Sequence, residues 1–319
     1  MAPVALAQDR RLACPLDRAA AQDSVSPVPP YWMGQARSPL STSDNSQLTR
    51  TMKLIFLGSG SAFTIGADNF QSNMLLVSDR GKKLLIDCGS DIRFSLHAAG
   101  FSHPDITDIY ISHLHADHAG GLEYIGFSTK FDPRCNRPNL YLSKDLASDL
   151  WDRTLSGGMR SIEGDIADLE TFFEVHSIGR NGHFSWEGVE FNLVKVVHVN
   201  NGYFIMPAYG LFFEVSGVKV LLTTDTQLCL DELGEYYERA DMIFQDCETS
   251  RFPSSIHAHY QKLLALPEKI RNKMWLYHYQ PGALPDAKKD GFCGFVKRGQ
   301  TFELSEFLLS SDRQLAVQA

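Results

Sequence analysis

Four potential metal ligands lie within six positions of the sequence, in the stretch HLHADH at residues 113–118. Three of them are histidines, although the 319-residue chain contains only 11 histidines in all. Imidazole nitrogens and carboxylate oxygens are donors that bind zinc and similar transition ions. In an extended loop alternate side chains point the same way, so His113 and His115 could hold one ion together. Asp117 and His118 follow where a helical pattern begins, and there they would face a second ion.

Two ions need more than these four ligands, and three further candidates follow predicted strands. His198 in VVHV could complete the first site, and His278 in LYHY could complete the second. Asp225 in TTDT has two carboxylate oxygens and could bridge both ions. Five imidazoles and two carboxylates favour two zinc ions per chain, with manganese as the other candidate, over calcium or magnesium. With a bridging hydroxide counted, the residual charge is about +1, which favours a phosphate oxyanion at the site.

These ligands need a scaffold of strands, and the sequence predicts one. Short apolar runs alternate with turn residues, and the buried strand IYIS at 109–112 leads directly into the histidine cluster. Polar groups also follow KVV at 195–197, LLTT at 221–224 and MWLY at 274–277. Strand ends that meet at one edge commonly form the site of an α/β fold. Helical spacing predicts helices at 90–100, 119–127, 229–240 and 259–272.

Composition and charge limit the other possibilities. Hydrophobic residues make up 44% of the chain, and the net charge of −8 provides no global field that would attract nucleic acid. The six cysteines form no CxxC pair and no apolar run has transmembrane length, which indicates a cytoplasmic protein with reduced thiols and no membrane partner. Residues 1–51 are rich in Ser, Pro, Gln and Ala without a regular period, so we expect a disordered extension there. Residues 52–319 would then form the folded domain.

The motif and its downstream partners resemble those of the metallo-β-lactamase superfamily of dinuclear metallohydrolases, over about residues 52–305. The resemblance is greatest to the ribonuclease Z-like branch and, within it, to the anti-Pycsar phosphodiesterases, which degrade cyclic mononucleotides. It rests on MKLIFLGSGSAFT, DCGSDIRFSL, ISHLHADHAGGLEYIGFSTKF, FQDCET and MWLYHYQ. It implies an α/β fold, the four-layer αββα sandwich, with the metals at one edge of the sheets. It also implies a homodimer in which a loop of the partner helps to close the pocket.

The resemblance implies the same division of ligands between the two ions. The first ion would be held by three imidazoles and the second by a carboxylate and two imidazoles, with one carboxylate between them. In that order the residues are His113, His115 and His198, then Asp117, His118 and His278, with Asp225 between the ions. Asp87 in LIDCG ends a strand beside the site, and we expect it to orient a ligand imidazole rather than to bind metal.

Cleavage of a phosphodiester also needs a proton for the departing alkoxide, and a histidine near the metals can donate it. In ribonuclease Z-like enzymes this histidine opens the helix before the last metal strand, where the present chain has His257 and His259. Gln245 and Asp246 stand where that family usually has a His–Glu pair, so the choice between the two histidines stays open. Asp117 could steer the proton of the attacking hydroxide as well as bind metal.

Three functions share such a site. Hydrolysis of 3′,5′-cyclic mononucleotides (cCMP, cUMP, cAMP or cGMP) by a metal-bridged hydroxide needs only a compact pocket, for which NGYFIMPAYG and GFCGFVKRGQ supply aromatic candidates for base stacking. A ribonuclease Z-like tRNA 3′-endonuclease would need a charged arm, and residues 142–189 contain neither a Gly-Pro repeat nor a basic cluster. Lactone and thioester hydrolases use the same ligands but lack the ribonuclease Z-like flank. We therefore predict a metal-dependent hydrolase, a dinuclear zinc phosphodiesterase whose substrate is a cyclic nucleotide.

Overall fold

The computed structural model describes residues 51–65 and 68–304. Contacts divide the chain into two units, Met1–Gln47 and Leu48–Ala319, and all described residues lie in the second. The extension predicted for residues 1–51 therefore lies outside the described residues, except for Thr51. Among the described residues, no helix is both long and apolar enough to cross a membrane.

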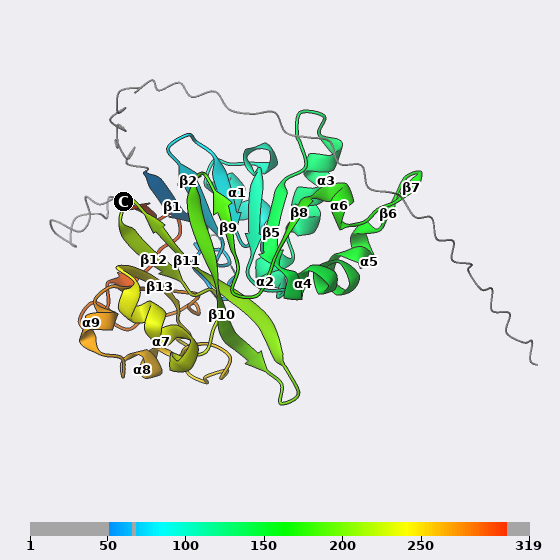
Figure 1. The fold of residues 1–319 in the computed structure, drawn as a ribbon. Helices are drawn as coiled ribbons and strands as arrows, with labels where there is room; N and C mark the ends of the chain where they lie inside the picture. The colour runs from blue at the N-terminus through cyan, green and yellow to red at the C-terminus, as the bar shows by residue number, and fades with distance from the viewer. Residues whose placement is uncertain (1–50, 66–67, 305–319) are drawn as a thin grey trace, which may run out of the picture. The chain divides into compact units, whose positions relative to one another are not determined.

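Two seven-stranded sheets form the framework of the described residues (Figure 1). The first sheet has the order β16-β1-β2-β3-β4-β5-β8 and the second has the order β15-β14-β13-β12-β11-β10-β9. Strands of the first sheet are β1 Met52–Phe56, β2 Met74–Ser78, β3 Lys83–Ile86, β4 Asp108–Ile111, β5 Asn139–Ser143, β8 Glu174–Ile178 and β16 Thr301–Leu304. Strands of the second sheet are β9 His183–Trp186, β10 Val189–Asn200, β11 Ile205–Val215, β12 Val218–Leu222, β13 Met242–Asp246, β14 Met274–Tyr277 and β15 Gly294–Phe295. A separate small hairpin consists of β6 Ser161–Ile162 and β7 Asp165–Ile166.

Aromatic side chains join the inner faces of the two sheets. The Phe56 ring on β1 lies 5.3 Å from the Phe244 ring on β13 and 5.5 Å from the Tyr277 ring on β14. All three side chains are fully buried. Burial of an aromatic side chain removes about 150–250 Å² of surface from water, so this layer is a major source of stability.

Helices cover the outer faces of both sheets. The described helices are α1 Ile92–Ala98, η1 His103–Asp105, α2 Ala116–Ala119, α3 Leu122–Phe131, α4 Lys144–Asp149, η2 Leu150–Leu155, α5 Ser156–Met159, α6 Leu169–Phe172, α7 Leu230–Arg239, α8 Tyr260–Leu263 and α9 Glu268–Arg271. Ile92 of α1 and Ile125 of α3 pack into the core of the first sheet. Leu233 of α7 and Leu263 of α8 belong to a second apolar cluster, against the second sheet. The predicted four-layer αββα order is confirmed.

Both sheets contain a parallel half. Strands β3, β4, β5 and β8 are parallel neighbours in the first sheet, and β12, β13, β14 and β15 are parallel neighbours in the second. The remaining pairs of the two sheets are antiparallel. Carboxyl ends of parallel strands meet at one edge of a sheet, so each half presents the residues after its strands at a common edge.

One predicted helix is interrupted. The sequence predicts a single helix over 259–272, but α8 ends at Leu263 and α9 begins at Glu268. Pro267 lies between them as the N-cap residue of α9. Proline interrupts the helix because it lacks an amide hydrogen and disfavours helical backbone in the residue before it. The helices predicted at 90–100 and 229–240 are present as α1 and α7.

Candidate metal centre

Five residues at the candidate site end a parallel strand or follow one within three residues. Asp87 follows β3, and His113 lies two residues after β4 in the first sheet. In the second sheet Asp225 follows β12, Asp246 ends β13 and His278 follows β14. The fold therefore gathers at its strand ends the side chains that are far apart in the sequence.

Three of these strand ends turn through left-handed backbone at residues other than glycine. The φ angles are 62° at Asp87, 53° at Thr224 and 63° at His278. Such conformations cost about 1–3 kcal/mol each and persist where the surrounding structure holds them. Their concentration at one edge is typical of a functional site.

The first donor set consists of His113, His115, His198 and Asp225. Nε2 of His113 and Nε2 of His198 each lie 3.1 Å from Nδ1 of His115. Oδ2 of Asp225 lies 3.8 Å from both Nε2 atoms. These are distances at which one ion could contact all four atoms.

A β-bulge aims His198 at this set. The pairing of β10 with β11 shifts its register between Val197 and Asn200, and bulges near sites commonly redirect a side chain. Nδ1 of His198 donates a hydrogen bond of 2.8 Å to the carbonyl of Ile256, which leaves Nε2 as the donor atom for a metal.

The second donor set consists of Asp117, His118, Asp225 and His278, and all four side chains are buried. Nε2 of His118 lies 3.1 Å from Oδ2 of Asp117 and 3.2 Å from Oδ2 of Asp225. Nε2 of His278 lies 3.4 Å and 3.3 Å from the same two oxygens. Asp225 therefore belongs to both sets, so all seven predicted ligands come together.

Asp87 and Ser112 orient two of the imidazoles. Asp87 accepts hydrogen bonds from Nδ1 of His118 at 2.7 Å and from the Ser112 amide and hydroxyl at 2.8 Å, as expected for a residue that positions a ligand. Because the Ser112 hydroxyl donates to Asp87, it accepts from Nδ1 of His113, 3.0 Å away. Nε2 of each histidine is then the nitrogen with a lone pair for an ion.

Electrostatics of the two donor sets fit divalent cations. Burial lowers the pKa of His113, and it lowers the pKa of His198 to about 4, so both imidazoles are neutral and able to ligate. Burial also opposes charge on His278, but Asp225 and its neighbouring carboxylates raise the pKa of that imidazole to about 10. Nε2 of His118 and Oδ1 of Asp225 are buried without a hydrogen-bond partner. The second set thus favours a positive charge and has unused donor atoms, and a divalent ion would meet both requirements.

The two candidate acids lie in different surroundings. Nδ1 of His257 donates to Oδ2 of Asp246 at 2.7 Å, and the His257 ring lies 4.8 Å from the ring of His198 and 4.6 Å from that of His278. His259 instead caps α8, where its Nε2 donates to the carbonyl of Ser250 at 3.0 Å and its Nδ1 accepts from the amide of Gln261 at 3.3 Å. Only His257 is in contact with the predicted ligands.

Asp246 is the site residue that sequence reasoning did not assign. Its Oδ2 accepts from His257 and from the amide of Thr226, and its Oδ1 lies 3.5 Å from Nδ1 of His278. Its position at the end of β13, between the strands β12 and β14 that precede Asp225 and His278, was the available signal. Gln245 points away from the site, because its Oε1 accepts a hydrogen bond from Tyr237 of α7.

The structure separates the two aromatic segments proposed for base stacking. Tyr203 and Phe204, between β10 and β11, are 96% and 63% exposed. In the second segment, Phe292 is buried and Phe295 packs against Tyr260. Only the first segment presents aromatic rings that the described fold leaves uncovered.

The fold and the paired donor sets define a hydrolase of the metallo-β-lactamase fold. In agreement, the chain resembles the metallo-β-lactamase fold protein YhfI from Bacillus subtilis, with a TM-score of 0.61 and 18% identity over 79% of this chain and 99% of that one. A family model described as anti-Pycsar protein Apyc1 matches residues 52–302, and the chain belongs to this family.

Two relatives illustrate the family. The anti-Pycsar protein Apyc1 of Paenibacillus harenae is 34% identical over 231 residues, which is 72% of this chain and 90% of the relative. That of Bacillus phage vB_BveM-Goe7 is 31% identical over 261 residues, which is 78% of this chain and 97% of the relative. The predicted family is confirmed, and the chain is an enzyme that hydrolyses phosphodiester bonds.

Proposed function

We propose that the protein is a dinuclear zinc phosphodiesterase that opens 3′,5′-cyclic mononucleotides. The observation that carries this proposal is the sharing of Oδ2 of Asp225 by two four-donor sets of imidazoles and carboxylates. When bound there, two zinc or manganese ions would lower the pKa of water and polarise a phosphoryl oxygen. Family membership supports a cyclic nucleotide as the substrate.

The chain's own residues supply orientation and proton transfer in this proposal. Asp87 and Ser112 fix the imidazoles of His118 and His113, and Asp117 would orient the attacking water as well as hold an ion. Asp246 binds Nδ1 of His257, so a proton on the other nitrogen, Nε2, could be donated to the departing ribose oxygen.

The charge of the segment after β5 disfavours tRNA as the substrate. Residues 144–172 fold into α4, η2, α5, the β6–β7 hairpin and α6. They include three basic and seven acidic residues, a net charge of −4. Phosphate contacts supply most of the affinity for nucleic acid, and an acidic surface would repel them.

We also propose a homodimer and a cytoplasmic location. Exposed Tyr203 and Phe204 lie within six residues of His198, where they could contact either the substrate or a second copy of the chain. The described cysteines are all free thiols, in keeping with a reducing compartment.

A substrate panel tests the proposed activity. Purified protein is given cyclic mononucleotides, precursor tRNA, an aryl phosphodiester and a homoserine lactone, with Asp225→Ala as the matched control. We expect hydrolysis of the cyclic nucleotides, and loss of turnover in the variant because both donor sets lose a ligand. Hydrolysis of the lactone alone would place the enzyme among carbonyl hydrolases, and trimming of tRNA alone would restore the endonuclease.

A further inference from the structure

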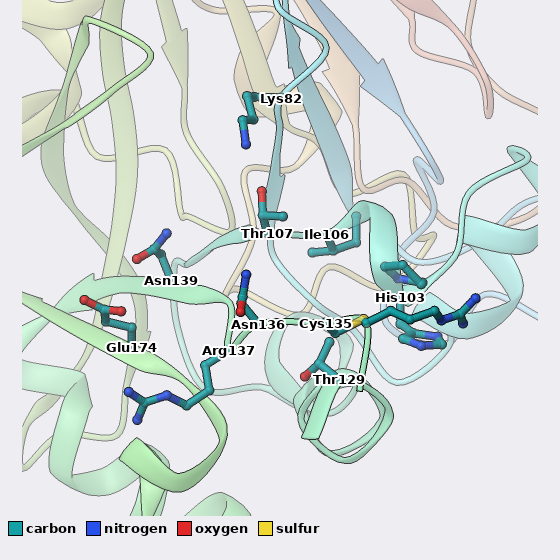
Figure 2. Close-up of a pocket in the computed structure, with 12 residues that line it drawn as sticks. Lys82, His103, Ile106, Thr107, Thr129, Cys135, Asn136, Arg137, Asn139 and Glu174 are labelled. Carbon is teal, nitrogen blue, oxygen red and sulfur yellow. The ribbon is translucent and has the colours of Figure 1, made fainter. Parts of the chain in front are cut away.

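A cavity lies at the amino ends of the first sheet's parallel strands, opposite the ends that carry the candidate metal centre. Its volume is about 560 Å³, and Thr107, Asn139 and Glu174, which precede or begin β4, β5 and β8, line it. The candidate metal centre follows the carboxyl end of β4, so the two places are separated by the length of that strand. Figure 2 shows this cavity, with His103 and Cys135 on one side and Arg137 and Glu174 on the other.

Two side chains that line this cavity, and a third beside them, are donors of the kind that zinc binds. Atoms of His103, Asp132 and Cys135 lie within 4.8 Å of one another. Nε2 of His103 is 3.2 Å from Oδ2 of Asp132, a usual separation for two ligands of one ion. No sequence motif marks His103 as a ligand, since Asp132 and Cys135 lie about 30 residues further along the chain.

Local structure holds these donors in place without an ion. His103 opens the short helix η1, which has a capping box between Ser102 and Asp105. Asp132 is the C-cap residue of α3, and the amide of Cys135 donates to its carbonyl at 3.0 Å. A site whose ligands are already positioned loses less conformational entropy on binding.

Arg134 orients the carboxylate without occupying it fully. Its Nε lies 2.9 Å from Oδ1 of Asp132, and its Nη2 lies 2.6 Å from Oδ2. The Arg134 side chain is 79% exposed, so this ion pair contributes little stability by itself. The Arg134 amide also donates to Oδ1, at 3.0 Å. Of the about four lone-pair positions of the carboxylate, the one left for a cation is therefore on Oδ2, on the side of His103.

We propose that His103, Asp132 and Cys135 form a third, mononuclear site for a zinc-type divalent cation. Three protein ligands would leave a coordination position open toward the cavity, as in labile rather than fully enclosed zinc sites. His103 and Cys135 line the cavity, which provides the path for entry. This proposal is independent of the hydrolytic activity, because none of the three residues belongs to the dinuclear donor sets.

Binding of the cation would change the protonation of one ligand, Cys135. Burial and the Asp132 carboxylate raise the pKa of the Cys135 thiol, so the thiol keeps its proton until an ion arrives. Binding forms the metal–sulfur bond, breaks the S–H bond and releases the proton to solvent. The thiolate and the carboxylate then oppose the two charges of the cation, and the exposed Arg134 guanidinium leaves the site with a net charge of about +1.

Cobalt substitution tests the site directly. The full chain is stripped of metal and titrated with Co²⁺, and absorption is recorded in the near ultraviolet, where thiolate-to-cobalt charge transfer is seen. The seven predicted dinuclear ligands include no sulfur, so this band reports a cysteine ligand. We expect three ions per wild-type chain by elemental analysis, and two ions without the band in Cys135→Ser and His103→Gln.

Two controls keep the result interpretable. Cys229→Ser removes another partly exposed free thiol and should leave both the band and the metal count unchanged. Hydrolysis of the aryl phosphodiester should be unchanged in Cys135→Ser, which shows that the variant folds and keeps the dinuclear centre. Absence of the band from wild-type protein, or its persistence in Cys135→Ser, would overturn the proposal.

Discussion

At the level of single residues, the hydrogen bond made by one ring nitrogen of a histidine decides whether the other nitrogen can bind metal or transfer a proton. Nδ1 of His198 is bound by a backbone carbonyl and Nδ1 of His118 by Asp87, so in each case Nε2 faces the donor set. Nδ1 of His257 is bound by Asp246, but its Nε2 has no hydrogen-bond partner among the described residues. His259 uses both ring nitrogens on backbone groups. Of the two candidate acids, His257 therefore retains a ring nitrogen that could transfer a proton to substrate, whereas His259 does not.

Substitution of these two histidines should separate their roles. His257→Gln is expected to lower kcat for cyclic nucleotides by about 10²–10⁴-fold, the usual contribution of a general acid. It should affect an aryl phosphodiester much less, because an aryl oxide departs without a proton. His259→Gln should leave both rates within a few fold, and metal content should stay constant in both variants. Equal losses on the two substrates in His257→Gln would contradict the assignment.

At the level of elements, the sequence predicts the strands and the residues that follow them. It predicts less well where each side chain of the site points and which partner it contacts. The ligands after β4, β12 and β14 could be recognised because polar residues follow apolar runs there. The bulge at His198 could not be recognised from the sequence, since it depends on pairing with β11. The capping role of His259 could not be recognised either. Asp246 was missed because its partner His257 is contacted only after folding. These three features depend on strand register and on contacts between residues that are distant in sequence, which only the folded structure provides.

The hairpin formed by β10 and β11 should contribute to binding of the cyclic nucleotide. Tyr203→Ala with Phe204→Ala is expected to raise KM for cyclic nucleotides about tenfold, because stacking of a base on an aromatic ring contributes about 1–3 kcal/mol. Hydrolysis of the aryl phosphodiester should change little. Phe94→Ala, which removes a 52% exposed ring from α1, is the matched control. Light scattering shows whether the mass equals twice 35.7 kDa and whether the double variant lowers it. An unchanged KM and mass would exclude both uses of the hairpin.

At the level of the whole molecule, the candidate centre joins the two sheets. His113, His115, Asp117 and His118 follow a strand of the first sheet, whereas His198, Asp225 and His278 belong to strands or strand ends of the second. Each donor set therefore takes side chains from both sheets. Ions that bind only the folded arrangement stabilise it by mass action, in addition to the aromatic layer between the sheets.

Removal of metal should consequently destabilise the fold. An ion present at 100 times its Kd contributes about 2.7 kcal/mol, so chelation should lower Tm by about 5 °C or more. Scanning calorimetry before and after dialysis against EDTA, and again after return of Zn²⁺ or Mn²⁺, measures the change. Asp225→Ala should show a much smaller response to the chelator. A Tm that is the same with and without metal would contradict a centre that links the sheets.

The order of the ligands along the chain has a consequence for synthesis on the ribosome. The imidazoles of the first donor set are all translated by residue 198, but the shared carboxylate at 225 and the last imidazole at 278 follow much later. A nascent chain that has not yet exposed β14 carries an incomplete centre, with imidazoles and carboxylates that a cellular cation could engage in the wrong combination. Correct loading of the proposed ions would therefore wait until nearly all of the described fold has left the exit tunnel.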